Sequence, residues 1–161
     1  MKTKITLKIK IAIFLIGLAL LSPASIMAAD TNWPNWRGAG ENGSTSIGSY
    51  VTKFDNEKNV KWKTKLPAKG CSTPIVWKDQ IIITSPDGKN DTLVSFNWGG
   101  KKLWQTTVGN ERSGKHRNGS GSNPSAITDG KLLFAYFKSG NLAGFTLDGK
   151  LIWKTNLQQR F

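Results

Sequence analysis

Short apolar runs alternate with turn residues along the chain from residue 30 onward. Residues 151–157 read Leu-Ile-Trp-Lys-Thr-Asn-Leu, in which one face is apolar and the other polar at the period of a half-buried strand. No apolar spacing of three and four residues persists in this part of the chain, so helix is a minor component. The pattern predicts an all-β fold in which short strands follow one another through tight turns.

The same markers return along the chain in one order. A Trp followed by a polar residue and Thr occurs at Trp62, Trp104 and Trp153, with spacings of 42 and 49 residues. Three further matches lie between these segments: residues 72–79 with 122–129, 81–84 with 132–135, and 93–96 with 142–145. Self-similarity at a period of this size indicates a repeat architecture.

Each repeat contains about four β-prone runs separated by Gly, Asp, Asn and Pro. The pairs Gly99-Gly100 and Asp148-Gly149 predict hairpins with two-residue primed turns, because glycine adopts the positive φ that such turns need. Further turns are expected at residues 78–80, 86–88, 129–131 and 139–141.

Four strands in a repeat of 42 to 50 residues is the period of a propeller blade. We therefore expect an all-β β-propeller of roughly two to two and a half four-stranded blades. Trp62, Trp104 and Trp153 are interpreted as structural residues that wedge between neighbouring sheets, and Gly100 and Gly149 as turn residues of the same repeat. Because a propeller closes with about four to eight blades, the chain is expected to be the N-terminal part of a longer protein.

The first 29 residues follow a different pattern. Four lysines within the first ten residues precede an uninterrupted apolar run over residues 11–21, and Ala28 and Ala29 offer a cleavage point. This order predicts a signal peptide over residues 1–29, with an uncleaved membrane anchor as the alternative. Residues 30–161 then form the partial propeller domain. We expect an exported, periplasmic or extracellular protein with no transmembrane span after signal removal.

The composition narrows the class of partner. The sequence has 23 Lys and Arg against 10 Asp and Glu, and without the four signal-peptide lysines its net charge is about +9. Such a surface attracts an anionic envelope polymer, or it is only a solvated basic surface that maintains solubility. A protein is the other class of partner that the sequence allows, whereas nucleic acid is not expected as the partner of an exported chain. Cys71 is the single cysteine, so it cannot form an internal disulfide.

A basic loop rich in Gly and Ser contains the single histidine. Lys115, His116, Arg117 and Asn118 form a candidate anion- or ligand-binding loop, since glycine leaves backbone N–H groups free to hold a sulfate, phosphate or carboxylate. The alternative is a solvated connection between two blades. No second histidine or cysteine accompanies His116 at metal-ligand spacing, so no metal site is assigned. The serines lack a base and the acidic residues lie mostly in turns, so no catalytic residue is assigned.

Several segments resemble the pyrroloquinoline-quinone-like (PQQ-like) repeat β-propellers, in particular an exported bacterial group that opens with Trp-Pro-x-Trp-Arg-Gly. They are Trp33-Pro34-Asn35-Trp36-Arg37-Gly38, residues 59–64, residues 72–74, and residues 116–130. The resemblance covers nearly the whole chain after residue 30 and implies a ring that is usually eight-bladed. It also implies that Trp33 and Trp36 pack against a closing blade, although such rings can stack on a sugar.

The resemblance leaves three functional classes open. The favoured one is a non-catalytic scaffold or binding protein of the cell envelope. A related lipoprotein propeller that helps to insert β-barrels starts from a lipidated cysteine; no such cysteine is present here, which counts against a direct equivalent and leaves the general scaffold role open. The second is part of a quinone (PQQ)-dependent oxidoreductase. This segment shows neither the adjacent cysteines nor the acidic calcium cluster of those enzymes, so no cofactor is assigned and PQQ is expected only in a full-length enzyme. The third is a polysaccharide-binding propeller.

Overall fold

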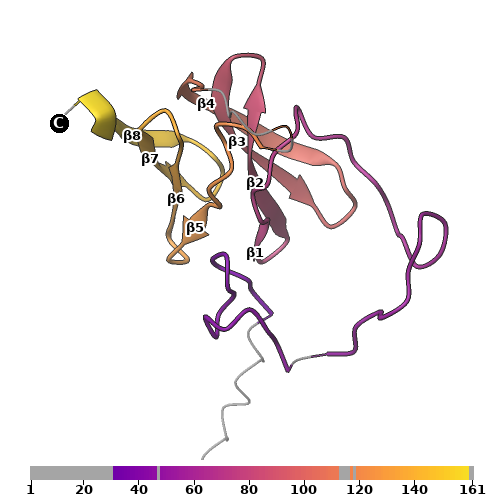
Figure 1. The fold of residues 1–161 in the computed structure, drawn as a ribbon. Coiled ribbons are helices and arrows are strands. Elements are labelled where there is room, and N and C mark those ends of the chain that lie inside the picture. Colours follow the sequence, from indigo (N-terminus) through magenta and orange to yellow (C-terminus); the bar gives the residue numbers. More distant parts are fainter. Residues whose placement is uncertain (1–30, 47, 113–116, 118, 160–161) are drawn as a thin grey trace, which may run out of the picture.

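The computed structural model describes residues 31–46, 48–112, 117 and 119–159 (Figure 1). They form two four-stranded antiparallel sheets, each with its strands in chain order. The first sheet contains β1 (Ile75–Trp77), β2 (Gln80–Asp87), β3 (Asn90–Asn97) and β4 (Lys102–Asn110). The second contains β5 (Ile127–Thr128), β6 (Leu132–Tyr136), β7 (Asn141–Thr146) and β8 (Leu151–Asn156), followed by the 3-10 helix η1 (Leu157–Gln159). The prediction of an all-β fold made of propeller blades is confirmed.

One apolar core lies between the two sheets. Ile82, Leu93 and Val108 of the first sheet pack with Leu133 and Phe145 of the second, and all five are buried. Because successive side chains of a strand point to opposite faces, the residues next to these in sequence belong to the other face of their sheet. Each sheet therefore gives one face to the shared core.

The other face of the first sheet has its own cover. Ile83, Val94 and Phe96 form a second buried cluster, against which Leu66 packs from the segment before β1. Burial on both faces explains why β2 and β3 are apolar or small along almost their whole length instead of alternating.

The hairpins between the third and fourth strands differ from the predicted two-residue primed turns. Gly100 N–H donates to the Asn97 carbonyl at 2.9 Å, and Gly149 N–H donates to the Thr146 carbonyl at 3.0 Å. Each turn therefore spans four residues with glycine last, at φ 78° and 86°, and each is next to a bulge in the strand pairing. Positive φ was correctly anticipated at these glycines, but the turn type was wrong: Asn97 N–H donates to the Lys101 carbonyl and Thr146 N–H to the Lys150 carbonyl, which leaves three loop residues instead of two.

Two further expectations need correction. Pro86 does not lie in a turn: it pairs with Asp91 within β2 and β3, and the turn follows at Gly88 and Lys89. Residues 60–64 are extended but form no strand, since no neighbouring strand pairs with them in the described part of the chain. A strand is defined by its partner, which a local pattern does not specify.

The segment that precedes the sheets is fixed to the free edges of their first strands. Trp33 N–H donates to the Val76 carbonyl at 2.8 Å, and Val76 N–H donates back at 2.9 Å. Thr128 N–H of β5 donates to the Pro34 carbonyl at 2.9 Å. This opening segment, drawn in indigo below β1 and β5, thus bridges the two sheets (Figure 1). Across the described ranges, no helix has the length and apolar character needed to cross a membrane.

Candidate interaction surfaces

The first recurring Trp packs against the last hairpin of the first sheet. A Cβ added to Gly100 would lie 2.7 Å from the Trp62 ring, so only glycine lets the ring approach the backbone this closely. Trp62 Nε1–H also donates to the Trp98 carbonyl in the same hairpin at 2.7 Å. Trp62 therefore joins the segment before β1 to the first sheet.

The second recurring Trp makes the same contact one sheet further on. A Cβ on Gly149 would lie 2.4 Å from the Trp104 ring, and the Thr106 hydroxyl donates to the Gly149 carbonyl at 2.5 Å. Trp104 Nε1–H donates to Gln80 Oε1 at 3.0 Å. Strand β4 thus contacts the turn between β7 and β8 through the Trp104 ring and the Thr106 hydroxyl.

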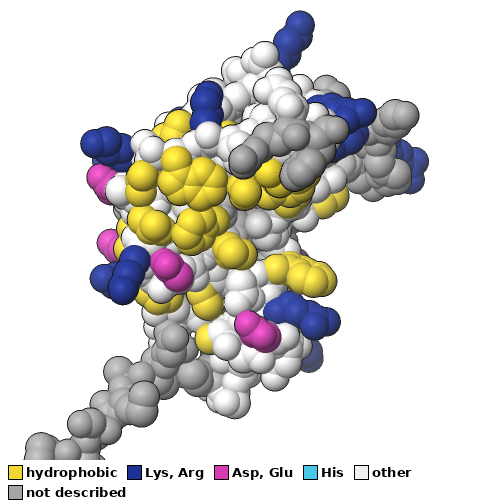
Figure 2. Space-filling view, turned by 90° about the vertical axis from the view of Figure 1, so that its left-hand side faces the viewer, with side chains coloured by type: hydrophobic (Ala, Val, Ile, Leu, Met, Phe, Trp, Pro, Cys, Tyr) yellow, Lys and Arg dark blue, Asp and Glu magenta, His cyan; other side chains and the backbone are white. Residues whose placement is uncertain are grey.

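The third recurring Trp has no such partner among the described residues. Trp153 lies over Gly144 of its own sheet, contacts the Phe134 ring at a centroid distance of 6.4 Å, and stays 40% exposed. Ile127, Tyr136 and Ile152 of the same sheet are also exposed. Leu142 lies on the face of Trp153, because Ala143 and Phe145 point into the shared core. Figure 2, which views the molecule from this side, shows hydrophobic side chains gathered over the second sheet.

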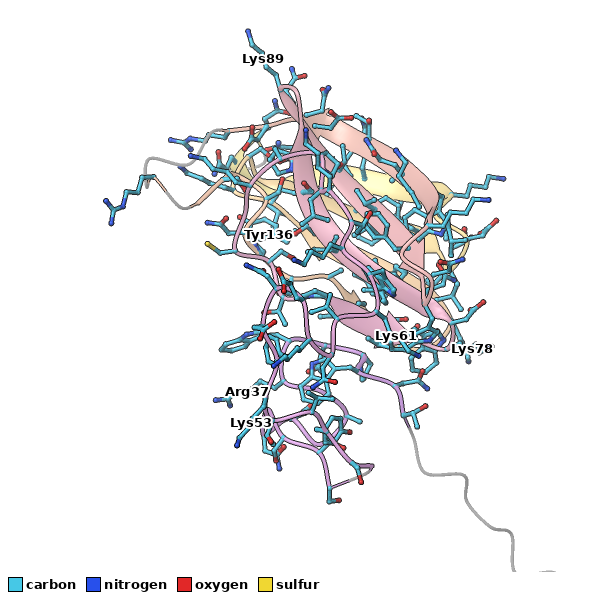
Figure 3. All side chains as sticks on the ribbon, turned by 90° about the vertical axis from the view of Figure 1, so that its right-hand side faces the viewer. Arg37, Lys53, Lys61, Lys78, Lys89 and Tyr136 are labelled. Atoms are coloured by element: carbon cyan, nitrogen blue, oxygen red, sulfur yellow. The ribbon has the colours of Figure 1, made fainter. Side chains whose placement is uncertain are left out.

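A different surface lies on the opening segment, where aromatic side chains occur among basic ones. Trp36, Tyr50 and Phe54 are 61%, 63% and 73% exposed, and the Arg37 guanidinium carbon lies 5.4 Å from the centroid of the Trp36 ring. Figure 3 shows Arg37 and Lys53 on the loops below the sheets. In Figure 1 these loops are two separate parts of the segment: residues 31–46 lie below β1 and β5, and the residues that follow lie further to the right. We name the exposed side chains of these two parts, Trp36, Arg37, Tyr50, Lys53 and Phe54, the opening surface. The expectation that Trp33 and Trp36 pack against a closing blade stays a prediction, since the described residues contain no such blade; within them the Trp33 ring lies against Gly38 and Trp36 is exposed.

A cleft lies within the same segment. It has a volume of about 550 Å³ and is lined by Trp33, Tyr50 and uncharged small, hydroxyl or amide residues, among them Asn32, Asn42 and Ser44. Asn42 is held in an Asx turn, since its Oδ1 accepts from Ser44 N–H at 3.0 Å and from the Ser44 hydroxyl at 3.1 Å. Uncharged donors beside aromatic rings suit a neutral, hydroxyl-rich ligand.

A buried carboxylate links the first sheet to the second sheet and to the loop that precedes it. Asp91 of β3 is fully buried and accepts hydrogen bonds from the hydroxyls of Ser139 at 2.5 Å and Ser122 at 3.2 Å, and from Asn141 Nδ2 at 3.0 Å. Burial raises the pKa of the Asp91 carboxyl above its ordinary value; the three hydrogen bonds oppose this and the charge of Glu111 adds to it. The sequence pattern assigned Asp91 no role, because a residue beside a turn looks solvated.

The candidate anion loop lies mostly outside the described residues. Nothing is described for Lys115, His116 and Asn118, and Arg117 is exposed with its carbonyl accepting from Lys69 Nζ at 2.6 Å. The base of the loop is closed by Gly121 N–H, which donates to Glu111 Oε1 at 2.7 Å. In the portion of the chain with assigned structure, no three His, Cys, Asp or Glu side chains gather in a way that could hold a metal ion.

Comparison with known proteins adds one finding. The family model described as outer membrane protein assembly factor BamB, a PQQ-like repeat family, matches residues 42–161, about three quarters of the chain. No curated protein matches the chain.

Proposed function

The chain belongs to the family of PQQ-like repeat propeller proteins, and from that premise we propose that it is an exported, non-catalytic scaffold of the cell envelope that binds a protein partner. The description of the matching family names an outer membrane protein assembly factor, and proteins of this family are typically exported. The partner is accordingly a protein of the apparatus that inserts β-barrels into the outer membrane.

The opening surface is the observation that supports this role. Trp, Tyr and Arg are the residue types that dominate binding energy in protein interfaces, and Trp36, Arg37 and Tyr50 are all exposed on the segment before β1, as is Phe54. Main-chain hydrogen bonds to β1 and β5 hold the start of the segment in place, so less conformational freedom is lost on binding. The excess of Lys and Arg over Asp and Glu favours an acidic partner through complementary charge.

A deletion and complementation experiment tests the proposal. Removal of the gene should lower the amount of folded β-barrel protein in the outer membrane, and the wild-type chain in its full-length gene should restore it. A Trp36→Ala, Phe54→Ala variant should restore it several-fold less, because the aromatic contacts are lost. Trp98→Ala is the matched control, since Trp98 is a similarly exposed Trp on the first sheet. Equal rescue by the opening-surface variant would contradict the proposal.

The described residues do not fit a PQQ and calcium site. The buried carboxylate of Asp91 is already engaged by Ser122, Ser139 and Asn141, and Asp55 and Asp129 are taken up by backbone N–H groups of their own turns. No chemical step through the quinone is derived for these residues. Dye-linked alcohol oxidation by the full-length protein with added PQQ and Ca²⁺ would support the oxidoreductase class in place of the scaffold.

A polysaccharide-binding role is the second candidate, and the uncharged cleft beside Trp33 and Tyr50 favours it. A neutral hexasaccharide should then change the tryptophan fluorescence on titration, and Tyr50→Ala should weaken its binding about tenfold. Tyr136→Ala is the control: Tyr136 is exposed but does not line the cleft, so this change should leave the titration unchanged.

A further inference from the structure

Lysines gather on the first sheet around the hairpin between β3 and β4. The Trp62 ring lies against Gly100 in this hairpin. Lys61 and Lys63 stand on either side of Trp62 in the chain, and Lys101 directly follows Gly100. The contact between the ring and the glycine therefore brings together lysines from two stretches that are far apart in the sequence.

Further lysines extend this group in two directions. Lys65 and Lys102 line one hollow with a volume of about 360 Å³ beside the segment that covers the first sheet. Lys78 lies in the β1–β2 turn, which in an antiparallel sheet is at the same end as the β3–β4 turn. Figure 3 shows Lys61 and Lys78 at this end of the sheet and Lys89, in the β2–β3 turn, at the other. We name the six exposed lysines of this region the lysine surface: Lys61, Lys63, Lys65, Lys78, Lys101 and Lys102.

Neighbouring carboxylates do not neutralise the positive charge of the lysine surface. Lys63 Nζ donates to the Asn56 carbonyl, a neutral acceptor, at 2.9 Å. The acidic residues of the turn and the hollow are Asp79 and Asp87, and Asp87 Oδ2 accepts from Gln105 Nε2 at 2.7 Å. Within the described ranges, no carboxylate forms an ion pair with any of the six lysines. This end of the first sheet therefore attracts anions.

The residue types of the lysine surface favour a membrane over a protein as its partner. All six cations are lysines, which carry hydrated point charges on flexible stems, whereas arginine makes the planar bidentate contacts that recognise a single carboxylate. Lysine is also depleted in protein interfaces, where arginine is enriched. A cluster of lysines is attracted to a surface of anionic lipid without any fixed geometry, because the attraction adds up over the ammonium groups.

An apolar side chain accompanies these charges. Leu103 follows Lys102 at the start of β4 and is 46% exposed. Peripheral membrane proteins combine basic residues, which meet the headgroups, with apolar residues that enter the boundary between headgroups and acyl chains. Leu103 is placed to make the second kind of contact.

We propose that the lysine surface binds the protein to a bilayer that contains anionic phospholipid, with the ammonium groups among the lipid phosphates and Leu103 below them. In this orientation the β1–β2 and β3–β4 turns face the bilayer. The inference does not rest on the proposed scaffold role, because the lysine surface and the opening surface share no residue.

Vesicle sedimentation tests the proposal. The full chain is mixed with vesicles of phosphatidylcholine alone, or with vesicles that contain about 30% phosphatidylglycerol, and the bound fraction is measured at rising lipid concentration. Binding should require phosphatidylglycerol. It should be lost when the salt concentration rises from about 0.05 M to about 0.5 M, because salt screens exposed charges. Equal binding to the two kinds of vesicle would overturn the proposal.

Two pairs of substitutions separate the lysine surface from net charge. Lys101→Gln together with Lys102→Gln should weaken vesicle binding about twentyfold, since each lysine near an anionic surface contributes about fivefold. Lys89→Gln together with Arg112→Gln is the matched control, which removes the same charge from the other end of the sheet, where Glu111 N–H donates to the Lys89 carbonyl. The control pair should change binding by less than about twofold. Equal losses in the two pairs would overturn the proposal.

A soluble polyanion is the competing partner, and Leu103 distinguishes it from a bilayer. Leu103→Ser should weaken vesicle binding about threefold and leave the binding of polyphosphate unchanged, because only a bilayer buries the leucine side chain. Tighter binding of polyphosphate than of phosphatidylglycerol vesicles at equal phosphate concentration would overturn the proposal in favour of an anionic polymer.

Discussion

The two sheets have the same topology and related sequences but different surroundings. The first is covered on both faces, by the second sheet on one side and by the segment with Trp62 and Leu66 on the other. Among the residues that the structure describes, the second is covered on one face only. Strand β3 is accordingly buried at six consecutive positions, while β6 alternates between buried and partly exposed residues. The difference shows that a repeat of this kind obtains its burial from its neighbours and not from its own four strands.

The largest effect is expected when the contact between Trp104 of the first sheet and Gly149 of the second is removed. Gly149→Val should destabilise the protein by about 4 kcal/mol, because it combines strain at positive φ with displacement of the Trp104 ring. Gly88→Val is the matched control: Gly88 also has positive φ but nothing lies near its absent Cβ, so about 1–2 kcal/mol is expected. Urea unfolding at equilibrium measures both. Equal losses would mean that the Trp–Gly contact contributes nothing.

The next prediction uses a matched pair of leucines. Leu93→Ala should cost about 3 kcal/mol because it leaves a cavity in the shared core, whereas Leu142→Ala should cost about 1 kcal/mol or less on the uncovered face. Thermal and urea unfolding of the two variants give the comparison. A loss at Leu142 as large as that at Leu93 would show that the outer face is covered in solution.

A smaller effect is expected from pH at the carboxylate between the sheets. The folded-state pKa of Asp91 is raised, so the folded protein binds this proton more tightly than the unfolded chain. Its contribution to stability is therefore present in acid and is lost as pH rises from the ordinary aspartate pKa through the raised value. The stability of wild type minus that of Asp91→Asn should fall with rising pH across this window. Urea midpoints from pH 3 to 7 test the sign, and a difference that rises with pH would contradict it.

The smallest effect is expected on the uncovered face itself. Tyr136→Lys should change the free energy of unfolding by no more than about 0.5 kcal/mol, since Tyr136 is exposed. The added charge should also lower self-association, because exposed apolar patches promote it. Light scattering at increasing protein concentration measures this, with Lys131→Arg as a surface control that leaves both properties unchanged.

The repeat could be predicted from local patterns, but several details of the site could not. The positions of the hairpin glycines follow from sequence, since Gly at a turn between two β-prone runs has a local cause. The length of each of these loops depends on which residues of the two strands pair, which is a property of strand register. The place of Pro86 within β2 depends on which side of the strand lacks a hydrogen-bond partner. Trp36 and Trp33 belong to one motif, yet within the described ranges only Trp33 is packed, because Gly38 and β1 lie against it while Trp36 stays exposed.

The sequence by itself determined the period of the repeat, the β character of its runs and the places where the chain turns, because these depend on residues close together in the chain. Only the tertiary structure decided that the Trp62 ring packs on Gly100 and the Trp104 ring on Gly149. It also decided that Asp91 is buried between the sheets and that one face of the second sheet is exposed in the described part of the chain. Those features depend on contacts between residues 31 to 50 positions apart, whose geometry arises from the packing of whole sheets. Equivalent residues such as Leu93 and Leu142 therefore have different environments although their local sequences match.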